Sequence, residues 1–158
     1  MPLGGKNCWL PRIEAMRFPY SGQSKPLLGV TLTLGGQSLW AEGLLDSGSD
    51  VNVLPFGKGG ALGAVWDPRK TTLRLGGTFA GTPAMPLLLI AKVGDLLPVR
   101  LAFGWCETDD VPLIFGQTNF FMEFDICFFR SRGSPVQPLP LSRIWHVRRF
   151  PLPSSFPS

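Results

Sequence analysis

Apolar residues in this chain recur in short runs separated by glycines and polar turns, and few stretches show the 3.6-residue period of an amphipathic helix. The run at 27–34 is followed by Gly35-Gly36-Gln37 and then by a second run at 38–45, a pattern that predicts a β-hairpin. Other short runs between turn residues predict further strands at 51–54, 71–75, 84–91, 96–103, 111–115 and 125–129. The pattern therefore predicts an all-β fold.

The segments between and beyond these strands carry different signals. Residues 56–66 are rich in glycine and predict an irregular connection, whereas residues 117–123 favour a short helix with phenylalanines on its inner side. Prolines are frequent near the C-terminus, where we expect largely irregular structure, although Ile144-Trp145 and Phe150 could dock onto the rest of the chain. We divide the chain into a leader or edge segment at 1–16, a folded domain at 17–130 and a basic, proline-rich tail at 131–158.

Composition and charge narrow the class of protein. At 158 residues, 44% hydrophobic and 16% charged, the chain has enough apolar surface for one packed domain. The net charge of +4 is uneven: residues 1–125 carry ten Lys and Arg against eleven Asp and Glu, whereas residues 126–158 carry five arginines and no acid. The slightly acidic body gives no electrostatic support for binding nucleic acid.

Cysteine usage and hydropathy exclude further classes. Cys8, Cys106 and Cys127 lie far apart without a C-x-x-C pair, which argues against a disulfide framework and against a metal site. The adjacent carboxylates Asp109-Asp110 fall in a polar turn, where we expect them to be solvated. The longest apolar run, at 85–91, is too short to span a bilayer, and the N-terminus shows no signal-peptide pattern. We therefore expect an intracellular, cytoplasmic setting without membrane contact.

The strongest candidate for chemistry is Asp46, which follows the apolar run Gly43-Leu44-Leu45 and enters a turn at Ser47-Gly48. Burial beside an apolar strand raises the pKa of a carboxyl group unless neighbours hold it ionised. Gly48 permits a tight bend close to whatever the carboxylate touches. A turn or capping aspartate is the alternative, but the apolar runs on both sides favour a catalytic position.

The stretch Leu44-Leu45-Asp46-Ser47-Gly48-Ser49-Asp50 resembles the active-site signature of retropepsin-like aspartic proteases. Seventy residues later, Leu113-Ile114-Phe115-Gly116 is similar to the second signature of that family, in which apolar residues and a glycine precede a helix. The glycine-rich hairpin tip at 76–81 lies between them, where these proteases carry a flap. The resemblance covers residues 17–129. It implies an all-β, closed β-barrel lobe with a flap hairpin and one short C-terminal helix.

The resemblance also implies an activity. One lobe supplies one catalytic carboxylate, so a chain with a single D-S-G would act as a symmetric homodimer, in which two Asp46 side chains share a proton and activate a water molecule. Ser47, Gly48 and Ser49 would support the active-site turn, and no metal or cofactor is expected. A hydroxyl donor at Ser49 would favour the ionised carboxylates, which predicts an acidic pH optimum.

The substrate implied by the resemblance is a polypeptide in extended conformation, added as a strand between the flap and the catalytic turn. Asp50 occupies the position at which the family contacts substrate backbone, although a turn or capping role for it stays open. The other predicted substrate-binding residues are Gly77, Thr78, Phe79 and Ile114. Leu45 and Val53 are expected to line the pockets with Phe79 and Ile114, which favours apolar residues at the cleavage site.

One position departs from the family pattern. Many retroviral enzymes carry an arginine after the second-signature glycine, and it pairs with the aspartate four residues past the catalytic one. This chain has Gln117, so an ion pair of Asp50 would need another cation, such as Arg12 or Arg17. The alternative function is a catalytically silent retropepsin-fold module that serves for dimerisation or peptide binding.

Overall fold

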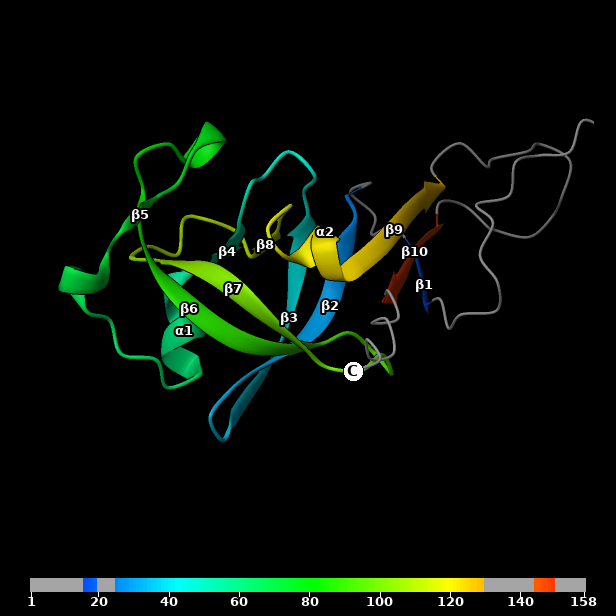
Figure 1. Cartoon of the computed structure of the whole chain (residues 1–158), viewed down its shortest axis with the longest axis horizontal. Coiled ribbons are helices and arrows are strands. Elements are labelled where there is room, and N and C mark those ends of the chain that lie inside the picture. Colours follow the sequence, from blue (N-terminus) through cyan, green and yellow to red (C-terminus); the bar gives the residue numbers. More distant parts are fainter. Residues whose placement is uncertain (1–15, 20–24, 130–143, 150–158) are drawn as a thin grey trace, which may run out of the picture.

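The computed structural model describes residues 16–19, 25–129 and 144–149, which are mostly β-strand (Figure 1). The strands are β1 (Met16–Pro19), β2 (Leu27–Leu34), β3 (Gln37–Leu45), β4 (Asn52–Leu54), β5 (Leu73–Arg74), β6 (Pro83–Lys92), β7 (Val99–Cys106), β8 (Ile114–Phe115), β9 (Phe124–Phe129) and β10 (Ile144–Arg149). The short helical segments are α1 (Phe56–Ala61), α2 (Phe120–Glu123) and the 3₁₀ turns η1 (Pro68–Lys70) and η2 (Gly77–Phe79).

Six of the described strands close into a barrel in the order β2-β3-β8-β4-β7-β6, because β6 also pairs with β2. The neighbours β3 and β8 run parallel, as do β4 and β7, whereas β4 and β8 are antiparallel. The parallel pairing places the end of β3, and with it Asp46, beside the end of β8. The prediction of a closed β-barrel is confirmed.

Alternating apolar positions explain how the barrel is filled. Leu28, Val30 and Leu32 of β2 are buried, with polar or small residues between them. The largest side chains of the core are aromatic, and Phe115 and Phe120 lie 4.6 Å apart between ring centroids. The largest fully buried side chains are Trp105, Phe103, Phe115, Phe120, Phe124, Leu28, Leu32, Leu54, Leu62, Leu89 and Leu101. This packing fixes the strands that carry the candidate site.

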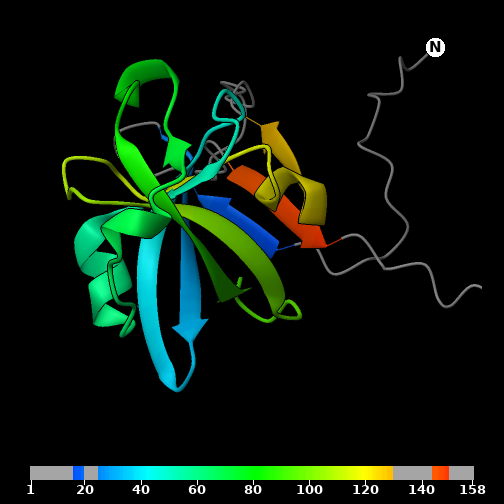
Figure 2. The same cartoon turned by 60° about the vertical axis from the view of Figure 1, so that its left-hand side comes forward.

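Strand β6 has two different partners along one edge. Its first residues pair with β5, with Ala84 opposite Leu73, and its last residues pair with β2, with Lys92 opposite Thr31. The β5–β6 hairpin therefore leaves the barrel wall where β2 no longer accompanies β6. Both views place this hairpin at the same end of the barrel as the loop between β3 and β4 (Figures 1 and 2).

A second, antiparallel sheet has the order β1-β10-β9 and lies on the side of the barrel away from the β5–β6 hairpin (Figure 1). Its strand β10 falls in the segment for which the sequence predicted largely irregular structure, so that prediction is wrong for Ile144–Arg149. This stretch has no proline, and Val147 is fully buried against the core. Pairing on both edges and one buried anchor make it a strand despite its proline-rich surroundings.

The prediction of an irregular connection at 56–66 is also wrong, because Phe56–Ala61 form the helix α1. Tertiary contacts overcome the low helix propensity of its glycines. Gly57 N donates to the Asp109 carboxylate at 2.7 Å, so Asp109 caps the helix instead of being merely solvated. A Cβ atom on Gly59 would overlap the indole ring of Trp105, so only glycine allows the helix to pack this closely.

Several strand boundaries differ from the predicted ones. The expected strand at 96–103 starts later, at Val99, because Leu96 N bonds to Val93 O at 3.0 Å in a turn. The expected helix at 117–123 is shortened to Phe120–Glu123. Gln117 and Thr118 instead bond to the loop after Asp46 through their backbone N–H groups, and Thr118 forms a parallel β-bridge with Val51.

Candidate active site around Asp46

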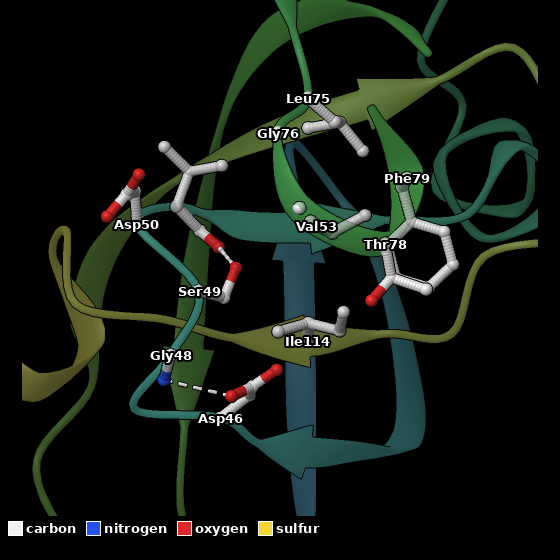
Figure 3. Close-up of a pocket in the computed structure, with 12 residues that line it drawn as sticks. Asp46, Gly48, Ser49, Asp50, Val53, Leu75, Gly76, Thr78, Phe79 and Ile114 are labelled. Atoms are coloured by element: carbon white, nitrogen blue, oxygen red, sulfur yellow. Dashed lines mark hydrogen bonds between the residues drawn. The ribbon is translucent and has the colours of Figure 1, made fainter. Parts of the chain in front are cut away.

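Asp46 begins a loop, residues 46–51, that we call the Asp46 loop. Its backbone N–H donates to Phe115 O at 3.0 Å, which continues the pairing of β3 with β8 past the end of the strand. One carboxylate oxygen of Asp46 accepts a hydrogen bond from Gly48 N at 2.9 Å (Figure 3). Ser49 N closes the turn on Asp46 O at 3.1 Å. The carboxylate, which is partly buried, is therefore oriented by the turn that it opens.

The other side of the Asp46 loop is bound to residues 117–118. The Gln117 side chain donates from Nε2 to Ser47 O at 2.8 Å, and its backbone N–H donates to Ser49 O at 2.8 Å. Thr118 N donates to Asp50 O, also at 2.8 Å. Three loop carbonyls are thus bound by two adjacent residues, which restrains the loop without a regular strand pair.

Gly116 permits this close approach. A Cβ atom built at Gly116 would lie 2.7 Å from Ser49 O and would overlap Val51 O. A side chain here would push the Asp46 loop away from the segment that binds it. The requirement for glycine at this position is steric, because its φ does not lie in the left-handed region.

A buried asparagine, which the sequence analysis missed, fixes the end of the loop. Asn52 is fully buried, accepts from Gly116 N at 2.8 Å and donates to Ala102 O at 2.9 Å. Asn119 Oδ1 accepts from Ala102 N at 3.0 Å, so the two amides tie three segments together. The available signal was an asparagine inside an apolar strand, because a buried amide requires partners.

The Ser49 hydroxyl does not act as the sequence analysis expected. Its Oγ donates to Val51 O at 2.9 Å (Figure 3). A hydroxyl group has one hydrogen to donate, so this bond leaves none for Asp46. Ser49 therefore stabilises the loop itself, and the argument from this residue for an acidic pH optimum loses its basis.

A pocket of about 220 Å³ opens between the Asp46 loop and the β5–β6 hairpin (Figure 3). Its lining residues are Asp46, Gly48, Ser49, Asp50, Val51, Val53, Leu75, Gly76, Gly77, Thr78, Phe79 and Ile114. The structure thus brings together the predicted Asp46, Gly48, Ser49 and Asp50 of the loop with the predicted Gly77, Thr78, Phe79 and Ile114.

Two predicted residues lie elsewhere. Leu45 is buried in the barrel core and does not line the pocket, because alternation along β3 points it inward. Ser47 is exposed and takes part through its carbonyl oxygen. Leu75 and Val51, which the sequence analysis did not name, do line the pocket.

The roof of the pocket is the β5–β6 tip, residues 76–81. It contains the 3₁₀ turn η2 and two glycines with positive φ, Gly77 at 60° and Gly81 at 84°. Arg74 donates from Nη1 to Gly81 O at 3.0 Å, and Leu75 N donates to Thr82 O at 3.0 Å. These hydrogen bonds lie within the hairpin itself, and Phe79 adds a contact with the apolar cluster that contains Val53 and Ile114.

The charges at the pocket are of one sign. Its lining includes the carboxylates Asp46 and Asp50 and has no lysine or arginine. Asp50 is exposed and forms no ion pair among the residues that the structure describes. Of its two expected partners, Arg12 and the side chain of Arg17 lie outside the described residues. Gln117 engages Ser47 O and does not replace the missing cation.

Below the pocket, Cys106 packs in a small apolar cluster with Val53, Leu75 and Ile114. Burial raises the pKa of the Cys106 thiol to about 11. The thiol is therefore neutral at ordinary pH and serves as an apolar packing group. Within the described part of the chain, no group of His, Cys, Asp or Glu is arranged to hold a metal ion.

Comparisons of the chain with models of protein families, with curated proteins and with solved structures find no match. The described residues also include no helix with the length and apolar character needed to cross a membrane. What bears on function is therefore the geometry around Asp46 and the resemblance of the two sequence motifs.

Proposed function

We propose that this chain is an aspartic endopeptidase of the retropepsin type, and that it acts as a symmetric homodimer. The observation that carries the proposal is the position of Asp46. Its carboxylate is oriented by Gly48 N at one end of a pocket whose apolar wall includes Val53, Phe79 and Ile114. A carboxylate held rigidly beside a binding surface for apolar side chains is what peptide hydrolysis through an activated water requires.

The proposed chemistry needs a second carboxylate. Two Asp46 side chains, one from each subunit, would share one proton, because like charges at short range do not both ionise. The ionised carboxylate takes a proton from a water molecule, whose oxygen attacks the scissile carbonyl carbon. The protonated one donates to the carbonyl oxygen. The tetrahedral intermediate then breaks its C–N bond: the amide nitrogen takes the proton that the first carboxylate had received from water, and a hydroxyl of the intermediate returns its proton to the other carboxylate, which leaves the carboxylic acid product.

The arrangement of the Asp46 loop supports pairing with a second copy. The chain contains one D-S-G, so a second catalytic turn has to come from another chain. Ser47 and Gly48 are exposed at the turn, which leaves them open to contact an identical turn across a twofold axis. The interface would be isologous, with the same residues contributed by each subunit.

The β5–β6 hairpin would act as the flap. It stands over the pocket opposite the Asp46 loop, and the hydrogen bonds of its tip lie within the hairpin itself. An extended peptide would enter between the tip and the loop and pair its backbone with both. The apolar lining around Phe79 and Ile114 would select apolar side chains at the cleavage site.

The test is cleavage of an apolar peptide library by the purified chain, with Asp46→Asn as the inactive variant. We expect cleavage by the wild-type chain, inhibition by a statine-type transition-state mimic, and loss of cleavage in Asp46→Asn with the dimer retained in sedimentation. Asp95→Asn is a control, because Asp95 is an exposed turn residue outside the pocket and the net charge changes equally. A dimer that binds peptides without cleaving them would instead identify the silent module.

A further inference from the structure

The uncompensated charge of Asp50 points to a specificity beyond apolar side chains. We propose that Asp50 is a specificity-determining residue that selects substrates with a lysine or arginine close to the apolar residue of the cleavage site. This inference rests on the proposed function, and it concerns which peptides the same pocket prefers.

The position of Asp50 suits contact with a bound peptide. Asp50 lines the pocket, is exposed, and lies on the opposite side of it from Phe79 and Thr78 (Figure 3). Its backbone is fixed because Thr118 N binds its carbonyl oxygen at 2.8 Å. This bond restrains the backbone that carries the Asp50 carboxylate at the pocket.

No cation among the described residues forms an ion pair with this carboxylate. The ion pair found among the described residues is that of Arg69 with Asp67, outside the pocket. Gln117, the residue best placed by sequence to contact Asp50, is uncharged and binds Ser47 O. Arg74 of the hairpin binds Gly81 O. Among the described residues, no cation therefore competes with a ligand for the Asp50 carboxylate.

The charged residues that line the pocket are all acidic. The lining residues include two carboxylates and no cation, so the local potential attracts positive charge and repels negative charge. In an extended peptide, side chains two residues apart point to the same side at a separation of about 7 Å. Since Ile114 and Asp50 line the same pocket, one bound peptide can contact both.

The test uses fluorogenic peptides that share an apolar cleavage site and carry Lys, Gln or Glu at one position, which is varied on either side of that site. We expect Lys to exceed Glu in kcat/KM by about fivefold or more at one position, and the ratio to shrink as salt is raised. Asp50→Asn should bring the ratio close to one, and Asp50→Lys should invert it. Asp95→Asn, with the same change in net charge as Asp50→Asn, should leave the ratio as in the wild type.

Binding of non-cleavable peptides of the same series, measured by fluorescence anisotropy, separates the two proposals. Cleavage without charge preference overturns the role of Asp50 and leaves the protease. Binding that favours Lys and depends on Asp50, without cleavage, supports the role of Asp50 and overturns the protease. An unchanged Lys-to-Glu ratio in both Asp50 variants overturns the inference, as does an absence of binding to every peptide.

Discussion

The Asp46 loop and the β5–β6 tip face each other across one pocket, and the chain secures them by different means. The loop is bound by long-range contacts to Gln117 and Thr118 and ends on the buried Asn52. The tip is held by hydrogen bonds within its own hairpin, such as Arg74 to Gly81 O, and by the packing of the partly buried Phe79, and it follows a strand of two residues. Long-range, buried contacts break only when the whole protein unfolds, whereas local, exposed contacts can break in a local opening.

This difference suits the proposed activity. A carboxylate that activates water needs a fixed position, because small displacements of a reacting group reduce the rate severely. The side through which a peptide enters needs the opposite property, since it has to open and close around the ligand. We therefore expect substitutions in the Asp46 loop and its supports to affect global stability, and equivalent substitutions in the tip to affect it little.

The largest effect is expected for Asn52→Leu, which keeps the size of the side chain but removes its hydrogen bonds. Gly116 N and Ala102 O would lose their partners inside the core. Unpaired buried groups of this kind destabilise proteins by about 1–3 kcal/mol each, so we expect a loss of about 3 kcal/mol or more in the free energy of unfolding. Urea denaturation measures it.

A control for Asn52→Leu is Thr33→Val on the exposed β2–β3 hairpin, where the hydroxyl bonds to Ser38 at 2.8 Å. We expect this change to stay within about 0.5 kcal/mol of the wild type. Equal effects of the two substitutions would contradict the assignment of Asn52 as the anchor of the loop.

The next effect compares two glycines, one on each side of the pocket. Gly116→Ala would drive a methyl group into Val51 O and Ser49 O, so we expect about 2–4 kcal/mol of destabilisation and loss of peptide cleavage. Gly76→Ala in the tip meets no atom within 4 Å and has no positive φ. We expect the free energy of unfolding of Gly76→Ala to lie within about 0.5 kcal/mol of the wild-type value. Thermal unfolding measures the stability of both variants. A destabilised Gly76→Ala would show that the tip is fixed as firmly as the loop.

A smaller contrast comes from two side chains that each donate to a carbonyl oxygen. Gln117→Leu removes the bond to Ser47 O, and we expect about 1 kcal/mol of destabilisation together with a several-fold lower kcat at nearly constant KM. Arg74→Leu removes the bond to Gly81 O in the tip. We expect it to destabilise the protein by less than about 0.5 kcal/mol and to change mainly KM. The kinetic constants separate the two sides, because a merely structural role for Gln117 would leave kcat of the folded fraction unchanged.

Much of the barrel could be predicted from the sequence because its strands have local signals. The hairpin of β2 and β3 shows alternating apolar residues around a glycine turn, and the structure places it within one residue of the predicted bounds. The helix α1 could not be predicted, because its stability comes from Asp109 and Trp105, which lie far away in the sequence. The strand β10 was missed for a similar reason, since pairing with β1 and β9 outweighs its proline-rich surroundings.

The candidate site divides in the same way. The turn residues Asp46 and Gly48 carry their signal in adjacent positions, so a motif could find them. The support from Gln117 depends on bringing two distant segments together, and no local pattern encodes it. Leu45 was misplaced because an apolar residue beside a catalytic-type turn can face either side, and the strand register decides which.

The smallest effect concerns Cys106, which lies where the two sides of the pocket meet, in contact with the cluster that contains Leu75 of the hairpin and Val53 of the barrel. Burial raises the pKa of its thiol from 9.0 to about 11, so at pH 8 its thiolate fraction is about 100-fold below that of an ordinary thiol. We expect Cys106 to react with a thiol reagent far more slowly than the partly buried Cys127 in the native chain, and at a similar rate in urea. Its native rate should rise about tenfold per pH unit between pH 8 and 10, because the thiolate is still the minor form there.

Arg74→Leu, which loosens the tip, should accelerate the labelling of Cys106 more than Gln117→Leu does, as followed by mass spectrometry of the labelled peptides. Equal acceleration by both variants would mean that Cys106 becomes accessible through global unfolding, and the tip would then be no looser than the Asp46 loop.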